Sequence, residues 1–201
     1  MPLIAPRVSS SASPLADLLA DLDRAFTALG IRWYLFGAQA AILYGVARLT
    51  ADVDVTVDAG SLANADLVAH LAARGFELRV PDAGEFLAQT RVLPLVHAES
   101  RIPVDVVLAG PGLEELFFSR VEQRNVGGVR IPVAAAEDIV TMKVLAGRLK
   151  DLDDVASILR ACALDPDRVR STLRLLEQAL DRRDLVDEFE RLLRQAGRQS
   201  Q

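Results

Sequence analysis

The sequence predicts an α+β protein, with a mixed-sheet N-terminal domain over residues 1–134 and a helical domain over residues 135–201. Short runs rich in Val, Ile and Thr recur up to residue 133 and alternate polar with apolar residues, which is typical of strands with one buried face. Segments with helical leucine spacing interrupt these runs. After residue 135, leucine stripes and Arg–Asp/Glu pairs three or four residues apart indicate helices alone.

The individual strands and helices follow in chain order. Ser13 and Pro14 supply a cap and a first-turn proline for the first helix, which ends at Gly30. The predicted strands are residues 32–36, 53–57, 76–80, 90–97, 101–108, 120–126 and 129–133. The predicted helices are residues 15–29, 38–44, 61–74 (capped by Ser61), 113–118, 136–149, 151–162, 166–181 and 184–196. Residues 81–89 have no clear pattern.

Composition limits the classes of function open to the chain. The net charge of −5 does not suggest a protein that coats nucleic acid. Apolar residues make up 51% of the chain, yet no apolar run is long enough for a membrane span, so we expect a soluble protein. The single Cys162 excludes an internal disulfide, and with no secretory signal visible we expect a cytoplasmic protein. Two histidines and one cysteine make a zinc site implausible.

Charge is distributed unevenly along the chain. Residues 1–100 contain 7 basic and 11 acidic residues, and residues 101–201 contain 16 basic and 17 acidic residues. The cations therefore lie mostly in the second half, opposite a first half rich in carboxylates. This arrangement suits a phosphate chain held between a metal ion and cations, and it equally suits arginine-rich surface helices.

Two aspartates share one face of the second predicted strand. Asp52 and Asp54 are two residues apart, so their side chains point the same way, as does that of Thr56. Two adjacent carboxylates repel each other, and a divalent cation between them removes that cost. Mg²⁺ favours sites with one or two carboxylates plus substrate phosphates. The alternative is that these residues form the solvated face of an edge strand.

The order of these motifs resembles the nucleotidyltransferase superfamily of the DNA polymerase β type. The pattern of that superfamily is an apolar residue, Gly, then Gly or Ser, and later an Asp-x-Asp/Glu. Here Phe36-Gly37-Ala38 stands thirteen residues before Asp52-x-Asp54, and Asp105 supplies a third carboxylate on a later strand. Two longer stretches look like the AbiEii-type toxin nucleotidyltransferases, including the MenT-like proteins. They read Arg48-x-Thr50-x-Asp52-x-Asp54 and Ala136-Glu137-Asp138-Ile139-Val140-x-x-Lys143-x-x-Ala146-Gly147-Arg148-x-Lys150-Asp151-x-x-Asp154.

The resemblance implies a catalytic and metal-binding set of three carboxylates. Asp52 and Asp54 would hold Mg²⁺, which grips the triphosphate and activates an acceptor hydroxyl for attack on the α-phosphate. Asp105 would complete the set and serve as general base. Gly37 would let the backbone approach the phosphates, and the following helix would offer free N–H groups.

The remaining nucleotide-binding residues follow from the same resemblance. They are Gly37, Ala38, Arg48, Thr50, Lys143, Lys150 and Asp154. Ala38 departs from the expected Gly or Ser, so a serine contact to phosphate is lost. Arg48 and Thr50 either orient the loop before the aspartate pair or have a purely structural role.

The two lysines stand out because the chain has 21 Arg and only 2 Lys. We place Lys143 and Lys150 in one helical segment, seven residues apart and so on nearly the same face. A compact ammonium suits a triphosphate as a point charge, and the resemblance gives Lys143 a phosphate contact. The alternative is a solvated helix face with an ion pair between Lys150 and Asp154.

These features lead to one preferred function and two alternatives. The resemblance implies an Mg²⁺-dependent enzyme that transfers NMP from an NTP to an acceptor hydroxyl. It suggests the toxin of a toxin–antitoxin pair, with an RNA (a tRNA 3′ end) as acceptor and a cognate antitoxin as partner. The alternatives are transfer to a small molecule or a protein, and a non-catalytic, antitoxin-like binding module, which Ala38 favours. His70, His97 and Cys162 are interpreted as structural.

Overall fold

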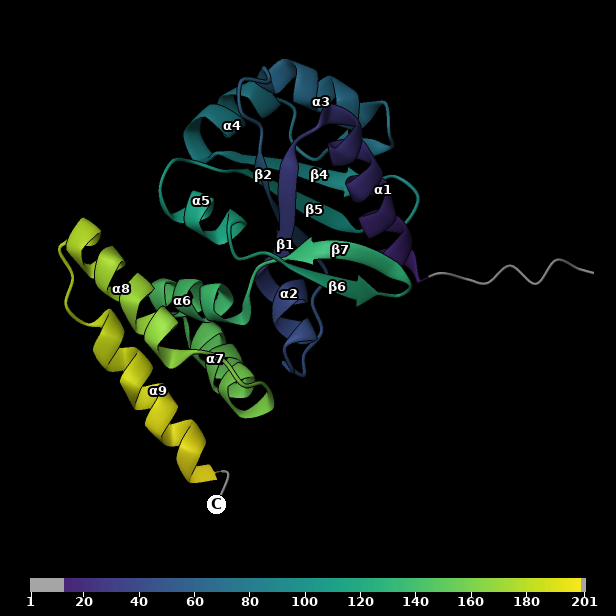
Figure 1. The fold of residues 1–201 in the computed structure, drawn as a ribbon. Helices are drawn as coiled ribbons and strands as arrows, with labels where there is room; N and C mark the ends of the chain where they lie inside the picture. Colours follow the sequence, from purple (N-terminus) through teal and green to yellow (C-terminus); the bar gives the residue numbers. More distant parts are fainter. Residues whose placement is uncertain (1–12, 200–201) are drawn as a thin grey trace, which may run out of the picture.

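The computed structural model describes residues 13–199 as an α+β protein (Figure 1). Its strands are β1 (Arg32–Phe36), β2 (Val53–Asp58), β3 (Phe76–Leu78), β4 (Val92–His97), β5 (Pro103–Leu108), β6 (Glu122–Val126) and β7 (Val129–Val133). The helices up to the last strand are α1 (Pro14–Leu29), α2 (Gly37–Leu43), α3 (Asn64–Ala72), α4 (Ala83–Thr90) and α5 (Leu113–Phe118). The later helices are α6 (Ala136–Ala146), α7 (Leu149–Ala161), α8 (Pro166–Leu180) and α9 (Leu185–Gln199).

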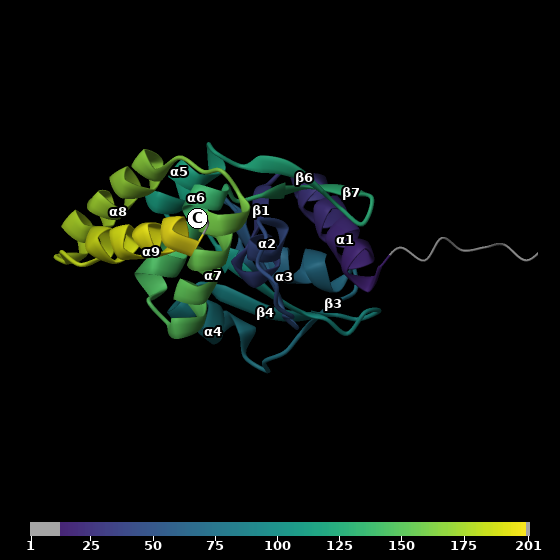
Figure 2. The same cartoon turned by 90° about the horizontal axis from the view of Figure 1, so that it is seen from below.

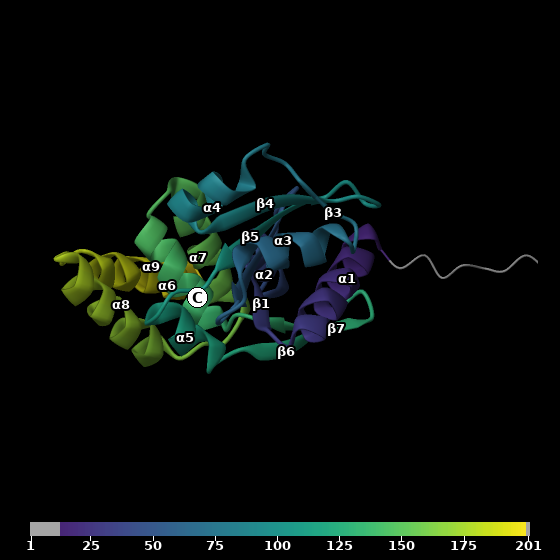
Figure 3. The ribbon, with the colours of Figure 1, turned by 90° about the horizontal axis from the view of Figure 1, so that it is seen from above.

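The seven strands form one mixed sheet in the order β3-β4-β5-β2-β1-β7-β6. Figure 3 shows α3 and α4 beside the part of the sheet that contains β3 and β4. Figures 1 and 2 both show α6 to α9 gathered at the opposite end of the molecule from α1. The predicted fold class is therefore confirmed. No helix within residues 13–199 combines the length and apolar character that crossing a membrane requires.

Helix α1 illustrates how closely local sequence controls its element. The Ser13 hydroxyl accepts a hydrogen bond from the Ala16 N–H at 3.2 Å. Gly30 ends the helix with a φ of +65°, a conformation that suits glycine. The leucines between them bury one apolar stripe in the core. The predicted cap, first-turn proline and stop are all confirmed.

Strand β2 lies in the interior of the sheet, which settles the meaning of its aspartates. It pairs antiparallel with β1 and parallel with β5, and Asp54 is opposite both Phe36 and Asp105. Directly opposed residues on neighbouring strands point to the same face. The interpretation of Asp52, Asp54 and Thr56 as the solvated face of an edge strand is therefore wrong. Thr56 itself is buried.

Several predicted boundaries differ from the structure. Helix α3 begins at Asn64 with Ala63 at its cap, so Ser61 is not the cap. The third strand is shorter than predicted and stops at Leu78. The patternless residues 81–89 include most of α4, whose N-terminus is capped by the Asp82 carboxylate at 3.0 Å from the Glu85 N–H. Thr90 accordingly ends that helix, and strand β4 starts at Val92.

The two lysines lie on different helices. Gly147 has a φ of +64° and ends α6, which places Lys143 on α6 and Lys150 in the first turn of α7. The prediction of one helix with both lysines on nearly the same face is therefore wrong. Helical spacing continues across the break because a glycine C-cap interrupts the backbone without disturbing the apolar pattern.

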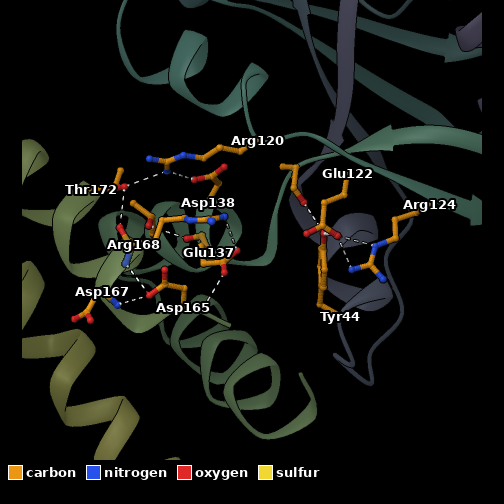
Figure 4. A network of polar contacts seen from close by, with 12 residues as sticks. Tyr44, Arg120, Glu122, Arg124, Glu137, Asp138, Asp165, Asp167, Arg168 and Thr172 are labelled. Carbon is orange, nitrogen blue, oxygen red and sulfur yellow. Dashed lines mark hydrogen bonds and ion pairs between the residues drawn. The ribbon is translucent and has the colours of Figure 1, made fainter. Parts of the chain in front are cut away.

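A polar network fastens the later helices to the sheet (Figure 4). Arg120, just before β6, donates to the Asp138 carboxylate of α6 at 2.9 Å and to the Thr172 hydroxyl of α8 at 3.3 Å. Glu137 accepts the Asp165 N–H at 2.9 Å before α8. The Tyr44 hydroxyl donates to the Ala134 carbonyl at 2.9 Å. These contacts position α6, which carries Lys143.

Candidate active site

The three predicted carboxylates come from two adjacent strands. Asp52 immediately precedes β2, Asp54 lies within it, and Asp105 occupies the opposed position on β5. Burial raises the pKa of Asp54 to about 6, and the negative charges of Asp52 and Asp105 add to the increase. The site therefore concentrates negative charge that a cation would stabilise.

Position 37 requires glycine because the Asp54 side chain occupies the space that a Cβ would fill. The φ of Gly37 is +65°, and a Cβ placed there would lie 1.9 Å from the Asp54 Oδ2. The backbone of the next residue, Ala38, hydrogen-bonds Asp54 and counteracts part of the rise in its pKa. Gly37 thus leaves space for the Asp54 carboxylate, and the Ala38 backbone hydrogen-bonds it. The sequence instead predicts that both residues contact the nucleotide phosphates.

Asp52 and Asp54 face a cavity of about 410 Å³. Its lining includes most of the predicted site residues: Gly37, Ala38, Arg48, Thr50, Asp52, Asp54, Lys143 and Lys150. Phe36, Val107, Ile139 and Met142 supply an apolar wall. A cavity with charged groups at one end and an apolar wall elsewhere has the character of a small-molecule site.

Asp151 and Asp154 of α7 hold the Lys143 ammonium beside this cavity. Its Nζ lies 2.6 Å from Asp154 Oδ2 and 3.4 Å from Asp151 Oδ1. Arg48 also pairs with Asp154, at 3.3 Å. Because Asp154 is buried against these two cations, the suggested ion pair with Lys150 is wrong. Lys150 has no hydrogen-bond or ion-pair partner among residues 13–199.

Two functional candidates in this region were not selected from the sequence. Arg148 donates to Asp151 Oδ2 at 2.5 Å, and both residues line the cavity. Burial acts to raise the pKa of Asp151, but the hydrogen bond from Arg148 and the charge of Lys143 hold that pKa below its usual value. Arg148 and Asp151 both lie inside the stretch of residues 136–154 that resembles the AbiEii-type family. That position in the motif was the sequence feature from which they could have been selected.

Asp105 differs from the other two carboxylates because it has a cation of its own. Arg79 pairs with its carboxylate, and the Arg79 Nε donates to the Leu95 carbonyl at 2.8 Å. Within the described part of the chain, no three His, Cys, Asp or Glu side chains are arranged to hold a metal ion. Asp52 and Asp54 both line the cavity, and Mg²⁺ favours sites with one or two carboxylates plus substrate oxygens.

The loop before β2 supports Asp52. The Thr50 hydroxyl donates to Asp52 Oδ1 at 2.5 Å, and Arg48 anchors the same loop to α7 through Asp154. By contrast, His97 is buried and contacts Asp21 and Ser100. His70 contacts the Ala25 carbonyl at 2.9 Å, outside the cavity.

A family model described as nucleotidyl transferase AbiEii toxin, type IV toxin–antitoxin system, matches residues 18–200. The chain belongs to the AbiEii nucleotidyltransferase toxin family. It is thus a member of a family of enzymes that transfer nucleotidyl groups. No curated protein matches the sequence.

Solved structures show the same fold at low identity. An antigenic nucleotidyltransferase-like protein from Paracoccidioides brasiliensis is 18% identical, with 90% of this chain and 94% of that chain covered and a TM-score of 0.54. The antibiotic-resistance factor ANT(2'')-Ia is 12% identical, with coverage of 85% and 95% and a TM-score of 0.57. The lincosamide antibiotic adenylyltransferase LnuA is 16% identical, with coverage of 73% and 96% and a TM-score of 0.50. The mixed sheet with its helices is therefore a nucleotidyltransferase fold.

Proposed function

We propose that this AbiEii-family enzyme uses Mg²⁺ to transfer NMP from an NTP to the 3′-terminal hydroxyl of an RNA, such as a tRNA. The observation that carries the proposal is the pair Asp52 and Asp54 facing one cavity with Lys143. The raised pKa of Asp54, caused by burial and by neighbouring carboxylates, supports a cation as the missing partner.

Each side chain has a role in the proposed transfer. Mg²⁺ bound by Asp52 and Asp54 would neutralise the triphosphate and polarise the α-phosphate. The acceptor oxygen forms a bond to the α-phosphorus, the bond to the bridging oxygen breaks, and pyrophosphate leaves. We assign the proton of the acceptor hydroxyl to Asp105, the general base of the set.

The cations of the cavity bind the leaving pyrophosphate in this proposal. Lys143 is held between Asp151 and Asp154, so it presents a fixed point charge. Arg48, Arg148 and Lys150 add charge around the opening, with Asp154 and Thr50 as supports for Arg48 and Asp52. Fixed cations stabilise developing charge better than mobile ones because no reorganisation is needed. The backbone at Gly37 and Ala38 completes the wall beside the phosphates.

The wider context of the proposal follows from the toxin family. We propose a cytoplasmic enzyme with a cognate antitoxin, a domain boundary near residues 134 and 135, and helices α6 to α9 as the carrier of the phosphate-binding lysine. Type IV toxin–antitoxin membership supports an antitoxin partner. The single free cysteine, Cys162, supports a reducing compartment.

The test is transfer of labelled nucleotide by the purified chain. Each α-labelled NTP is incubated with Mg²⁺ and total RNA, and the products are separated by size and digested to locate the label. Label at RNA 3′ ends, lost with EDTA and with Asp52→Ala, supports the proposal. Label that appears only on a small molecule or a protein redirects the acceptor assignment. Absence of any NTP turnover overturns the enzymatic proposal.

A further inference from the structure

Two leucines that are almost fully exposed to solvent lie next, in the chain, to residues of the catalytic cavity. Leu49 is 98% exposed and Leu149 is 84% exposed, more than any other large apolar side chain within residues 13–199. Each lies between two residues that line the cavity, Leu49 between Arg48 and Thr50, and Leu149 between Arg148 and Lys150. Single exposed leucines are ordinary, but two that interrupt the lining of one cavity on separate segments form a shared feature.

A second cavity of about 600 Å³ adjoins the catalytic cavity. It lies between the loop after α2 and helix α7, and it shares Arg48 and Lys150 with the catalytic cavity. Gly45 permits this loop to approach α7, because its φ is +99° and a Cβ there would lie 2.2 Å from the Ala161 Cβ. The two cavities therefore meet at two cations.

Arg48, which lines both cavities, has one N–H donor without a hydrogen-bond partner among the described residues. Its Nη2 pairs with Asp154, but its buried Nε has no hydrogen-bond partner within the described residues. A buried N–H without a partner costs free energy, so such a group is expected to find an acceptor when the site is filled. This donor and the unpaired Lys150 point to an anionic ligand.

The charge around the second cavity agrees with that conclusion. Its lining carries three cations, Arg48, Lys150 and Arg160, and two carboxylates, Asp153 and Asp154. The carboxylates Asp52 and Asp54 line the catalytic cavity instead. The whole chain carries a net charge of −5, so the lining of the second cavity differs in sign from the chain as a whole.

We propose that Leu49, Leu149 and the second cavity form the acceptor site, which holds the unpaired 3′-terminal nucleotides of an RNA. The inference rests on the proposed function and adds the location and the single-stranded character of the acceptor. Backbone phosphates follow Arg48 and Lys150, and the exposed leucines pack on the faces of unstacked bases. Apolar side chains are used in this way where nucleic-acid bases are unstacked.

The first experiment measures RNA binding without chemistry. An RNA hairpin with a blunt end is compared with the same hairpin carrying a short unpaired 3′ extension, using the full chain without NTP. The extended hairpin is expected to bind more tightly, and Leu49→Ser with Leu149→Ser is expected to remove that advantage. A rise of roughly tenfold in Kd corresponds to exposing one partly buried leucine.

The second experiment separates the acceptor from the nucleotide. In the transfer reaction, the double leucine variant is expected to raise the KM for the extended RNA by about tenfold. The KM for NTP and the kcat at saturating RNA stay unchanged. Leu175→Ser and Leu180→Ser are the matched controls, because these leucines of α8 are also exposed, at 56% and 50%, but the residues beside them in the chain line neither cavity.

The outcomes distinguish this inference from the proposed function. If wild-type protein binds the extended RNA in a leucine-dependent way but transfers no nucleotide, the proposed function fails and the RNA site stands. If wild-type protein labels RNA and the leucine variants match the α8 controls, the acceptor site is overturned. Equal affinity for blunt and extended hairpins, or transfer only to a small molecule or protein, also overturns it.

Discussion

Asp54 and Asp138 are two partly or fully buried carboxylates whose pKa values are both raised to about 6, with burial as the largest cause. Asp138 lies in the network that joins α6 to α8, where Arg120 donates to both Asp138 and Thr172 (Figure 4). Asp54 lies at a cavity, where its carboxylate neighbours are Asp52 and Asp105. The two groups share the cost of burial but differ in what surrounds them.

This difference separates a structural carboxylate from a candidate catalytic one. The charge of Asp138 is opposed by Arg120, which belongs to the fold and donates to Oδ1, while the buried Oδ2 has no hydrogen-bond partner among the described residues. The pKa of Asp54 is raised further by the charges of Asp52 and Asp105, and the Ala38 backbone hydrogen bond and the charge of Lys143 act in the opposite direction. A fold tolerates such repulsion where an external cation relieves it during function. The neighbours of a buried carboxylate, rather than its pKa, therefore distinguish the two roles.

The largest expected effect comes from replacing Asp54. Asp54→Asn keeps the shape of the side chain and removes the charge that holds Mg²⁺, so nucleotide transfer is expected to fall by roughly a thousandfold or more. The free energy of unfolding should not fall, because a repelled and buried charge is lost. Labelled-NTP transfer and urea denaturation measure the two quantities.

Asp138→Asn provides the matched control for that experiment. It neutralises a carboxylate with a similar pKa that lines no part of the cavity, and it keeps a side-chain oxygen that can accept from Arg120 and so hold α6 in place, so transfer is expected to stay within about threefold of wild type. If both variants lose activity equally, Asp54 acts through the fold and not through the reaction.

The candidate site around Asp52 and Asp54 was more predictable from the sequence than the boundaries of the surrounding helices were. Asp52-x-Asp54 and Phe36-Gly37 are local patterns, and a period of two residues determines which side chains share a strand face. Gly30 and Ser13 likewise act within one helical turn. These features were predicted because the residues that cause them are neighbours in the chain.

Features that depend on distant residues were not predictable. The need for Gly37 arises from Asp54, seventeen residues later, and becomes visible only when β1 and β2 pair. The pair between Arg79 and Asp105 crosses β4, which lies between β3 and β5 in the sheet. Lys143 and Lys150 were assigned to one helix because helical spacing continues across the break at Gly147. Helix α4 was missed because its eight residues are too few to establish a periodic pattern.

The second largest effect concerns the space beside Asp54. In Gly37→Ala the new Cβ would collide with the Asp54 carboxylate, so that group must move and transfer is expected to fall by about a hundredfold. Gly30→Ala is the matched control, because Gly30 has the same φ of +65° but nothing within 4 Å of an added Cβ. Both variants should lose about 1 kcal/mol of stability from backbone strain. Only Gly37→Ala should lose activity.

The third prediction uses the pH dependence of stability at Asp138. Its pKa in the folded protein is about 6, above the ordinary 3.8 of an unfolded chain. Between these values the folded state keeps a proton that the unfolded state has released, so this group lowers the free energy of unfolding as pH rises from 3.8 to about 6. Asp138→Asn should therefore gain stability relative to wild type across this window, on the order of 2 kcal/mol.

Asp184→Asn is the control for that titration. The pKa of Asp184 is lowered by its hydrogen bond with Arg182, so its contribution is present above the unfolded pKa and is lost as pH falls. Its difference from wild type should run in the opposite direction and be small, because the pair is exposed. Urea denaturation at a series of pH values measures both variants. A constant difference between Asp138→Asn and wild type would contradict the assignment.

The smallest expected effect comes from changing the partner of Asp105. This carboxylate is intermediate between Asp54 and Asp138, because it lies opposite Asp54 in the sheet but pairs with Arg79. Arg79→Met removes that cation and returns uncompensated negative charge to the carboxylate set. The Mg²⁺ concentration for half-maximal transfer should fall by about threefold, and stability should change by no more than about 1 kcal/mol, since the pair is partly exposed. Arg101→Met is the control, because Arg101 pairs with exposed Glu77 on the neighbouring strand and lines no cavity. If Arg79→Met instead weakens the Mg²⁺ dependence, Arg79 positions Asp105 for the metal site and the three carboxylates act as one group.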